Sequence, residues 1–65
     1  MQVIVNNEPR EIQGRTLADL LEELGFGGTV VATAVNGEFA PAAARTAREL
    51  AQGDRVEVVA PMQGG

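Results

Sequence analysis

The residue types that usually perform covalent chemistry in proteins are largely missing from this chain. Its 65 residues include no cysteine, histidine, serine, lysine, tyrosine or tryptophan. The common side-chain nucleophiles are therefore absent, and so is the residue that most often acts as a general base or a metal ligand. Carboxylates and threonines are the reactive side chains that remain, which argues against an enzyme.

The carboxylates do not form a promising acid–base pair either. Two carboxylates can share such work when a cleft separates their pKa values, but the sequence pattern places Glu22, Glu23, Glu38 and Glu57 in solvent. A chain this short buries only about 60% of the surface that it exposes when unfolded, so an internal active site has little room. We expect no catalytic side chains, no metal site and no bound cofactor.

One reactive group remains by elimination, the C-terminal carboxylate that follows Gly64-Gly65. Glycine has no Cβ, so such a tail can enter a narrow channel and leave its acyl carbon unshielded. Glycines also gather in chain tails without function, which is the alternative reading. We take Gly64 and Gly65 as candidate site residues, in a flexible tail over residues 61–65 that follows a domain over residues 1–60.

Charge and composition limit the partners and the setting. The chain has 9 acidic residues, 5 arginines and a net charge of -4, which disfavours nucleic acid and anionic membranes and favours a basic protein surface. Its hydrophobic content is 45%, with no apolar tract of about 18 residues that could span a membrane. Residues 1–6 do not resemble a signal peptide, and the chain has no cysteine for disulfides, so we expect a cytoplasmic protein.

A β-hairpin is predicted at the start of the chain. Met1, Val3 and Val5 alternate with polar or outward residues, as on one face of a strand. The turn formers at residues 6–9 then allow residues 10–13 to return as a short strand with an inward Ile12.

A helix follows, marked by four leucines at helical spacing: Leu17, Leu20, Leu21 and Leu24. Thr16 is a suitable N-cap, Asp19 can complete the cap, and Gly25 can end the helix in a left-handed conformation. Gly27-Gly28 is a weak candidate for a phosphate-binding loop, because such loops lie between a strand and a following helix. We expect a simple helix exit there, with Phe26 packing on the core.

The second half is predicted to contain three more strands. Residues 30–35 form a β-branched and alanine run, Asn36-Gly37 is a strong hairpin turn, and residues 38–40 pair back briefly. The pattern leaves open which parity of residues 30–35 faces the helix. Residues 55–60 form the last strand, with Val56 and Val58 inward.

Between the last two strands lies an alanine-rich stretch. Pro41 ends the preceding strand, and residues 42–50 have helical propensity. We expect one or two helical turns here, with Ala43, Ala47 and Leu50 on the packed side. Gly53-Asp54 then turns into the last strand.

These elements predict an α+β fold. Short connections allow one mixed sheet of four to five strands, with the main helix across one face and a short second helical segment. The first and last strands then pair in parallel at the centre of the sheet.

Several short motifs occur along this framework: Met1-Gln2-Val3 with Asn6, residues 14–21, Ala34-Val35-Asn36-Gly37-Glu38, Pro41, Gly53-Asp54-Arg55-Val56 and Gly64-Gly65. In this order the chain resembles the ubiquitin-like β-grasp sulfur carriers, most closely the family that serves bacterial thiamine biosynthesis. No single motif is specific, but their combination in a chain of this length is. One departure is Ala42, since related carriers often have a basic residue after the proline; Arg45 is the candidate substitute.

The resemblance implies a cycle at the C-terminus. An adenylyltransferase related to ubiquitin-activating enzymes uses ATP and magnesium to convert the Gly65 carboxylate into an acyl adenylate. A sulfur donor such as a cysteine desulfurase supplies the sulfur that replaces AMP. The resulting thiocarboxylate delivers sulfur to thiazole synthase for the thiazole moiety of thiamine.

Partner docking is a separate expectation. Ile4, Val59 and Met62 are candidates for exposed apolar residues that contact a partner, with Ala32 and Ala34 beside them if these point outward. Scattered surface hydrophobic residues are the alternative.

Two other functions remain open at this point. The small subunit of molybdopterin synthase, or a carrier for sulfuration of another metabolite, would have the same tail chemistry. A ubiquitin-like protein modifier or a plain binding domain is the alternative of another class.

Overall fold

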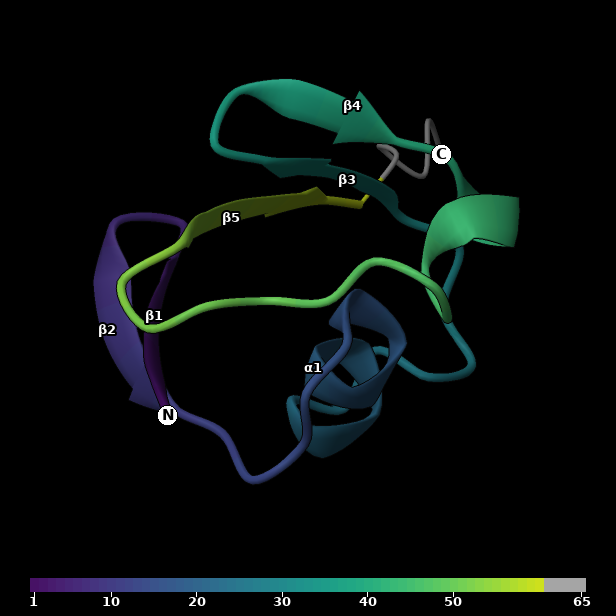
Figure 1. The fold of residues 1–65 in the computed structure, drawn as a ribbon. Helices are drawn as coiled ribbons and strands as arrows, with labels where there is room; N and C mark the ends of the chain where they lie inside the picture. Colours follow the sequence, from purple (N-terminus) through teal and green to yellow (C-terminus); the bar gives the residue numbers. More distant parts are fainter. Residues whose placement is uncertain (61–65) are drawn as a thin grey trace.

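The computed structural model describes residues 1–60, which form a five-stranded sheet with one α-helix (Figure 1). The elements in chain order are β1 (Gln2–Val5), β2 (Glu8–Glu11), α1 (Leu17–Glu23), β3 (Ala32–Val35), β4 (Glu38–Ala40), a 3-10 turn η1 (Ala42–Ala44) and β5 (Arg55–Val59). The strand order is β2-β1-β5-β3-β4. β1 and β5 are parallel, whereas the other neighbouring strands are antiparallel. The predicted mixed sheet with a central last strand is confirmed.

The helix forms where the leucine spacing predicts it. Leu17, Leu20 and Leu21 are buried against the sheet, and Leu24 is partly buried beside them. Figure 1 shows α1 on one side of the sheet and no helix of the described residues on the other side. The inner face therefore holds the core, whose members are Val3, Val5, Ile12, Leu17, Leu20, Leu21, Val31, Val35, Ala40, Leu50, Val56 and Val58.

Both predicted ends of α1 are confirmed. The Thr16 hydroxyl accepts a hydrogen bond from the Asp19 N–H at 3.1 Å, and the Asp19 carboxylate accepts one from the Thr16 N–H at 3.1 Å. These reciprocal bonds satisfy N–H groups that a helix leaves free at its start. Gly25 has φ of 88° just after the helix, and Phe26 packs against the core.

The first hairpin is tighter than predicted. Asn6 and Asn7 take φ values of 49° and 70° and form a two-residue turn, so β2 starts at Glu8 instead of Arg10. Asparagine tolerates this left-handed conformation better than most residues. Pro9 lies within β2, an edge strand, where a proline removes no hydrogen bond to β1. Ile12 follows β2 and is fully buried, as expected.

The predicted short helical segment forms within residues 42–50 as a single 3-10 turn, η1. The predicted packed side is wrong for two of its three residues, since Ala43 and Ala47 are exposed and only Leu50 is buried. The carbonyls of Arg48 and Arg45 accept hydrogen bonds from the Leu17 and Ala18 N–H groups, at 2.9 and 3.1 Å, and thus complete the start of α1. A regular helix over residues 42–50 would have used the Arg45 carbonyl internally, whereas the Arg48 carbonyl would have been free at its end.

The parity of β3, which the sequence left open, places Thr33 and Val35 inward. Ala32 is exposed and Ala34 is half-buried on the outer face. The second hairpin turn is confirmed, since Asn36 and Gly37 have φ values of 51° and 84°. Among residues 1–60, no helix is both long and apolar enough to cross a membrane.

Candidate functional site

The two residues of the candidate tail, Gly64 and Gly65, lie outside the described residues, as does Met62. What the structure describes is the strand that leads to them. β5 is bonded to β3 through four residue pairs, from Val35↔Val56 to Ala32↔Val59, and to β1 through Ile4↔Arg55 and Val5↔Val56. A strand paired on both sides has few free main-chain groups. The chain therefore leaves the sheet from its centre.

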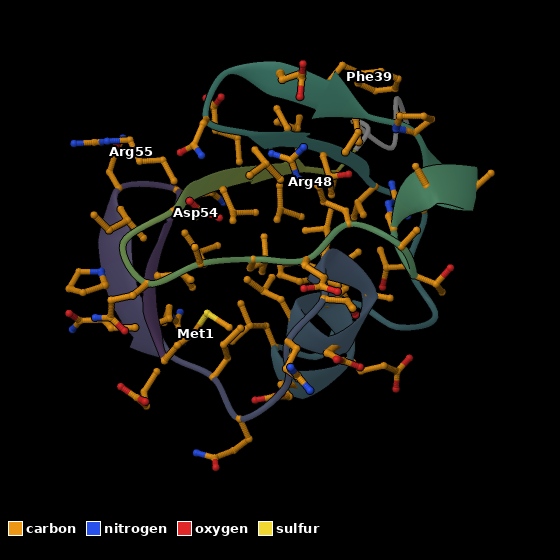
Figure 2. All side chains as sticks on the ribbon, in the orientation of Figure 1. Met1, Phe39, Arg48, Asp54 and Arg55 are labelled. Atoms are coloured by element: carbon orange, nitrogen blue, oxygen red, sulfur yellow. The ribbon has the colours of Figure 1, made fainter. Side chains whose placement is uncertain are left out.

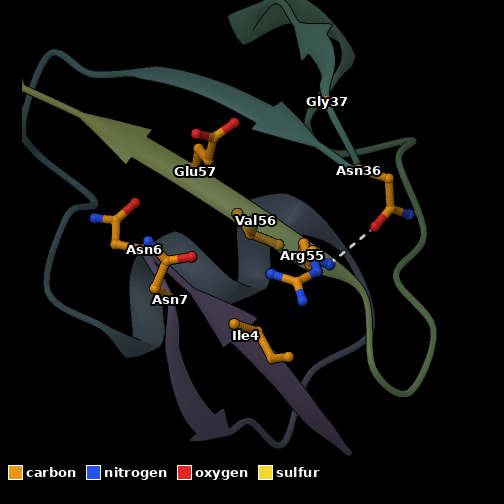
Figure 3. A pocket seen from close by; sticks show the side chains of 8 residues that line it. All are labelled: Ile4, Asn6, Asn7, Asn36, Gly37, Arg55, Val56 and Glu57. Atoms are coloured by element: carbon orange, nitrogen blue, oxygen red, sulfur yellow. Dashed lines mark hydrogen bonds between the residues drawn. The ribbon is translucent and has the colours of Figure 1, made fainter.

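Two asparagine side chains extend this pairing at the hairpin turns. The Asn36 side-chain oxygen accepts the Arg55 N–H at 3.0 Å (Figure 3). Its amide nitrogen donates to Asp54 Oδ1 at 3.1 Å. The Asn6 side chain donates to the Val58 carbonyl at 3.1 Å and accepts the Val58 N–H at 2.9 Å. The beginning and the end of β5 are thus each held by a turn residue.

The outer face carries two of the three candidate docking residues, Val59 and Ile4, which border different hollows. Val59 is 61% exposed and borders a shallow apolar hollow with Ala32, Ala34 and Phe39. Ile4 is half-buried and lines a neighbouring polar cleft instead, beside Asn6 and Arg55 (Figure 3).

Phe39 is an exposed apolar residue that was not predicted as part of the docking surface. It is 68% exposed, and it points away from α1 at the outer side of β4 (Figure 2). Phe39 pairs opposite Ala34 across the β3–β4 hairpin, so both side chains share one face. The exposure of Phe39 could have been predicted from the pairing of β3 with β4. The Asn36-Gly37 turn sets that pairing, and Phe39 then faces outward if Thr33 and Val35 face inward. We call Ala32, Ala34, Phe39 and Val59 the apolar patch.

One acidic side chain borders the apolar patch. Glu57 lies between the apolar hollow and the polar cleft and is exposed, and no salt bridge of Glu57 is found within residues 1–60. An apolar surface with a carboxylate at its margin fits a partner surface with apolar and basic side chains. Glu22, Glu23 and Glu38 are also exposed, as predicted.

The pKa of the Asp19 carboxyl group is lowered, chiefly by the hydrogen bond from the Arg15 main chain and further by the bonds from Thr16. That carboxylate serves the helix cap. No cluster of three potential metal-ligating residues occurs in the described part of the chain.

Arg45, the candidate substitute for a basic residue after Pro41, has an intramolecular role. Its Nε donates to the Thr33 hydroxyl at 3.2 Å, and its Nη2 donates to the Val31 carbonyl at 2.7 Å. The Thr33 hydroxyl in turn donates to the Ala40 carbonyl at 2.8 Å. Arg45 therefore ties residues 42–50 to β3 and β4, and two of its nitrogen atoms are already used.

Comparison with known proteins agrees with this architecture. The model of the ThiS family matches residues 3–65. The sulfur carrier protein ThiS of Thermus thermophilus is 46% identical over 63 residues, which cover 97% of this chain and 98% of the relative. The crystal structure of the thiamine biosynthesis protein ThiS from Geobacter metallireducens superposes with a TM-score of 0.83 at 30% identity and covers 100% of both chains. The ubiquitin-like β-grasp fold is thereby confirmed, and the chain belongs to the ThiS family.

Proposed function

We propose that this protein carries sulfur for thiamine biosynthesis as a thiocarboxylate on Gly65. Membership of the ThiS family supports the carrier role, as does the full-length match to a relative named as a sulfur carrier protein. The chain acts as a carrier and not as a catalyst, and the enzymes that handle it supply the catalytic groups. The observation that carries the proposal is the family match through residue 65, which includes both terminal glycines.

The chemistry proceeds in two steps at the terminal carboxyl group. The carboxylate attacks the α-phosphorus of ATP, which is bound with magnesium in an adenylyltransferase, and pyrophosphate leaves. Sulfide then attacks the acyl carbon; where the donor is the persulfide of a cysteine desulfurase, an acyl disulfide forms first and a thiol reductant cleaves its S–S bond to leave the thiocarboxylate. A C–S bond forms, the bond to AMP breaks, and one proton is released. Activation must come first because a free carboxylate is a poor electrophile.

The tail and the domain then have different tasks. The two glycines can enter a narrow and water-poor site, while β5 offers a rigid origin because it is bonded to strands on both sides. The thiocarboxylate passes its sulfur to thiazole synthase. All of these partners are expected in the cytoplasm.

Partner docking is assigned to the outer face of the sheet. Val59 and Phe39 form the apolar part of this surface within the described residues, and Ile4 lies at its polar margin. Met62, the third predicted docking residue, is proposed to contact the same partner. An exposed aromatic residue among small side chains is a typical anchor for a partner. Glu57 would face a basic residue of the adenylyltransferase.

The absence of cysteine allows a direct test. The protein is incubated with the adenylyltransferase, ATP, magnesium and sulfide, and then treated with a thiol-directed alkylating reagent at neutral pH. Since the chain has 0 cysteines, we expect one label per chain, located at Gly65 by fragmentation. A variant without Gly64 and Gly65 is the control and should remain unlabelled.

Two results would contradict the proposal. The first is an unlabelled protein under conditions that label the Thermus thermophilus carrier. The second is equal labelling of the truncated variant, which would place the reactive group elsewhere.

A further inference from the structure

The two strands that flank β5 end at different points along it. On one side, β3 accompanies β5 as far as Val59, which pairs with Ala32. On the other side, the β1 register ends where Val5 pairs with Val56. Without a further contact, Val58 would have unpaired main-chain groups on the β1 side, close to the point where the chain leaves the sheet.

Asn6 fills this gap with its side chain. The Asn6 N–H donates to the Val56 carbonyl at 2.9 Å and is the last main-chain group of this segment bonded to β5. The chain then turns away from β5, because Asn6 has a φ of 49°. The side-chain amide then continues along β5. It accepts the Val58 N–H at 2.9 Å and donates to the Val58 carbonyl at 3.1 Å.

Few residue types could do this. A side-chain amide offers one acceptor and one donor in a plane, as a peptide group does, and asparagine also tolerates a left-handed backbone. Aspartate would keep the acceptor but lose the donor. Glycine would keep the backbone conformation and lose both bonds.

The second hairpin offers a natural comparison. Asn36 has nearly the same backbone conformation, with φ of 51°, and its side chain also makes two hydrogen bonds. These bonds go to Arg55 and Asp54, at the beginning of β5. The two asparagines therefore make comparable contacts at opposite ends of the same strand.

We propose that Asn6 is a positioning residue for delivery of the tail. Its side-chain amide holds the last residues of β5 in place and thereby sets the direction in which the chain leaves the sheet. This inference rests on the proposed function. A carboxyl group held at the end of a short tail reaches a partner's site more often when its origin is fixed, and small misplacements of reacting groups are costly.

The test compares Asn6→Gly with two matched variants. Asn7→Gly changes the neighbouring residue of the same turn, whose φ is 70°, and Asn36→Gly removes two side-chain hydrogen bonds from the far end of β5. Adenylation is measured by ATP–pyrophosphate exchange with the adenylyltransferase, which gives kcat and KM for the carrier. Amide hydrogen exchange at Val58 is measured in parallel.

We expect Asn6→Gly to lower kcat about fivefold and to change KM by less than about twofold, because the apolar patch is intact. Its Val58 amide should exchange faster, while the Asn36 amide, which donates to the Arg55 carbonyl at 2.7 Å, should not change. Asn7→Gly and Asn36→Gly should keep the wild-type kcat. Asn6→Asp, which keeps the bond from the Val58 N–H, should lie between the wild type and Asn6→Gly.

The inference is wrong if Asn6→Gly and Asn36→Gly lower kcat equally, since the effect would then follow general stability. It is also wrong if Asn6→Gly has the wild-type kcat. If Asn6→Gly does not fold, the same criteria apply to Asn6→Asp. Failure of the wild-type protein to be adenylated, in an assay that adenylates the Thermus thermophilus carrier, would instead overturn the proposed function.

Discussion

Two consecutive valines show how differently the two faces of the sheet are used. Val58 is 6% exposed and Val59 is 61% exposed, although both belong to β5 and have the same side chain. Val58 lies on the face that α1 covers, whereas Val59 lies beside Phe39 on the open face. Burial in a strand alternates with a period of two, so adjacent residues can serve opposite purposes.

The inner face determines stability and the outer face is available for recognition. Among residues 1–60, twelve hydrophobic side chains form the inner core, while the apolar patch leaves an aromatic ring and a valine largely in water. Large apolar side chains that are exposed together are typical of interaction sites. Four substitutions test this division, in order of expected effect.

The largest effect is expected from Leu20→Ala in the inner layer. Leu20 is 0% exposed, and truncation of such a leucine leaves a cavity that costs about 2–5 kcal/mol of unfolding free energy. Urea denaturation followed by circular dichroism measures the loss. Val59→Ala is the control and should cost less than about 0.5 kcal/mol; similar losses in both variants would remove the distinction between the faces.

Val59→Asp should separate recognition from stability. A carboxylate in the apolar patch should raise KM for adenylation about tenfold, because it must lose its water on docking. The midpoint of urea unfolding should change little. Ala43→Asp, which introduces the same charge at an exposed residue of η1, should leave KM unchanged. A normal KM for Val59→Asp would place the docking surface elsewhere.

Arg45→Met tests how much the hydrogen bonds between residues 42–50 and the β3 region contribute to stability. The substitution removes the bonds to the Thr33 hydroxyl and the Val31 carbonyl. We expect a loss of about 1–3 kcal/mol, since partly buried polar groups lose their partner. Arg10→Met is the matched control, because the Arg10–Glu8 ion pair is exposed, and such pairs contribute little. A loss no greater than that of the control would show that Arg45 does not hold residues 42–50 in place.

The smallest effect is expected from Asp19→Asn at the start of α1. Folding lowers the pKa of Asp19, so its charge stabilises the fold fully above the ordinary value of 3.8 and less as the pH falls through the lower pKa of the folded state. Asp19→Asn should lower Tm by a few degrees at pH 7. The two melting temperatures should converge in strong acid, and a difference that persists there would contradict a role for the charge.

The elements that the sequence predicted well depend on local signals. The leucine stripe, Thr16 and Gly25 define α1 within ten residues, and Asn36-Gly37 specifies its turn by backbone conformation alone. Family motifs then supplied the β-grasp topology. The tail glycines were found by elimination and resemblance, and their role stays a prediction.

The features that the sequence did not reveal depend on distant contacts. Residues 42–50 have helical propensity, but their carbonyls bond to the start of α1, about 30 positions earlier in the chain. The exposure of Phe39 depends on which face of β3 meets the helix. The contact between Asn6 and Val58 joins residues 52 positions apart. None of these follows from the spacing of neighbouring residues.

The central position of β5 also has a mechanical consequence. A partner that pulls on the C-terminal segment pulls along β5, and the hydrogen bonds to its neighbours run across that direction. A force along β5 therefore acts on all of these hydrogen bonds at the same time. A force that pulled an edge strand sideways would break its hydrogen bonds one after another. The fold can therefore resist a force applied at the C-terminal end of β5.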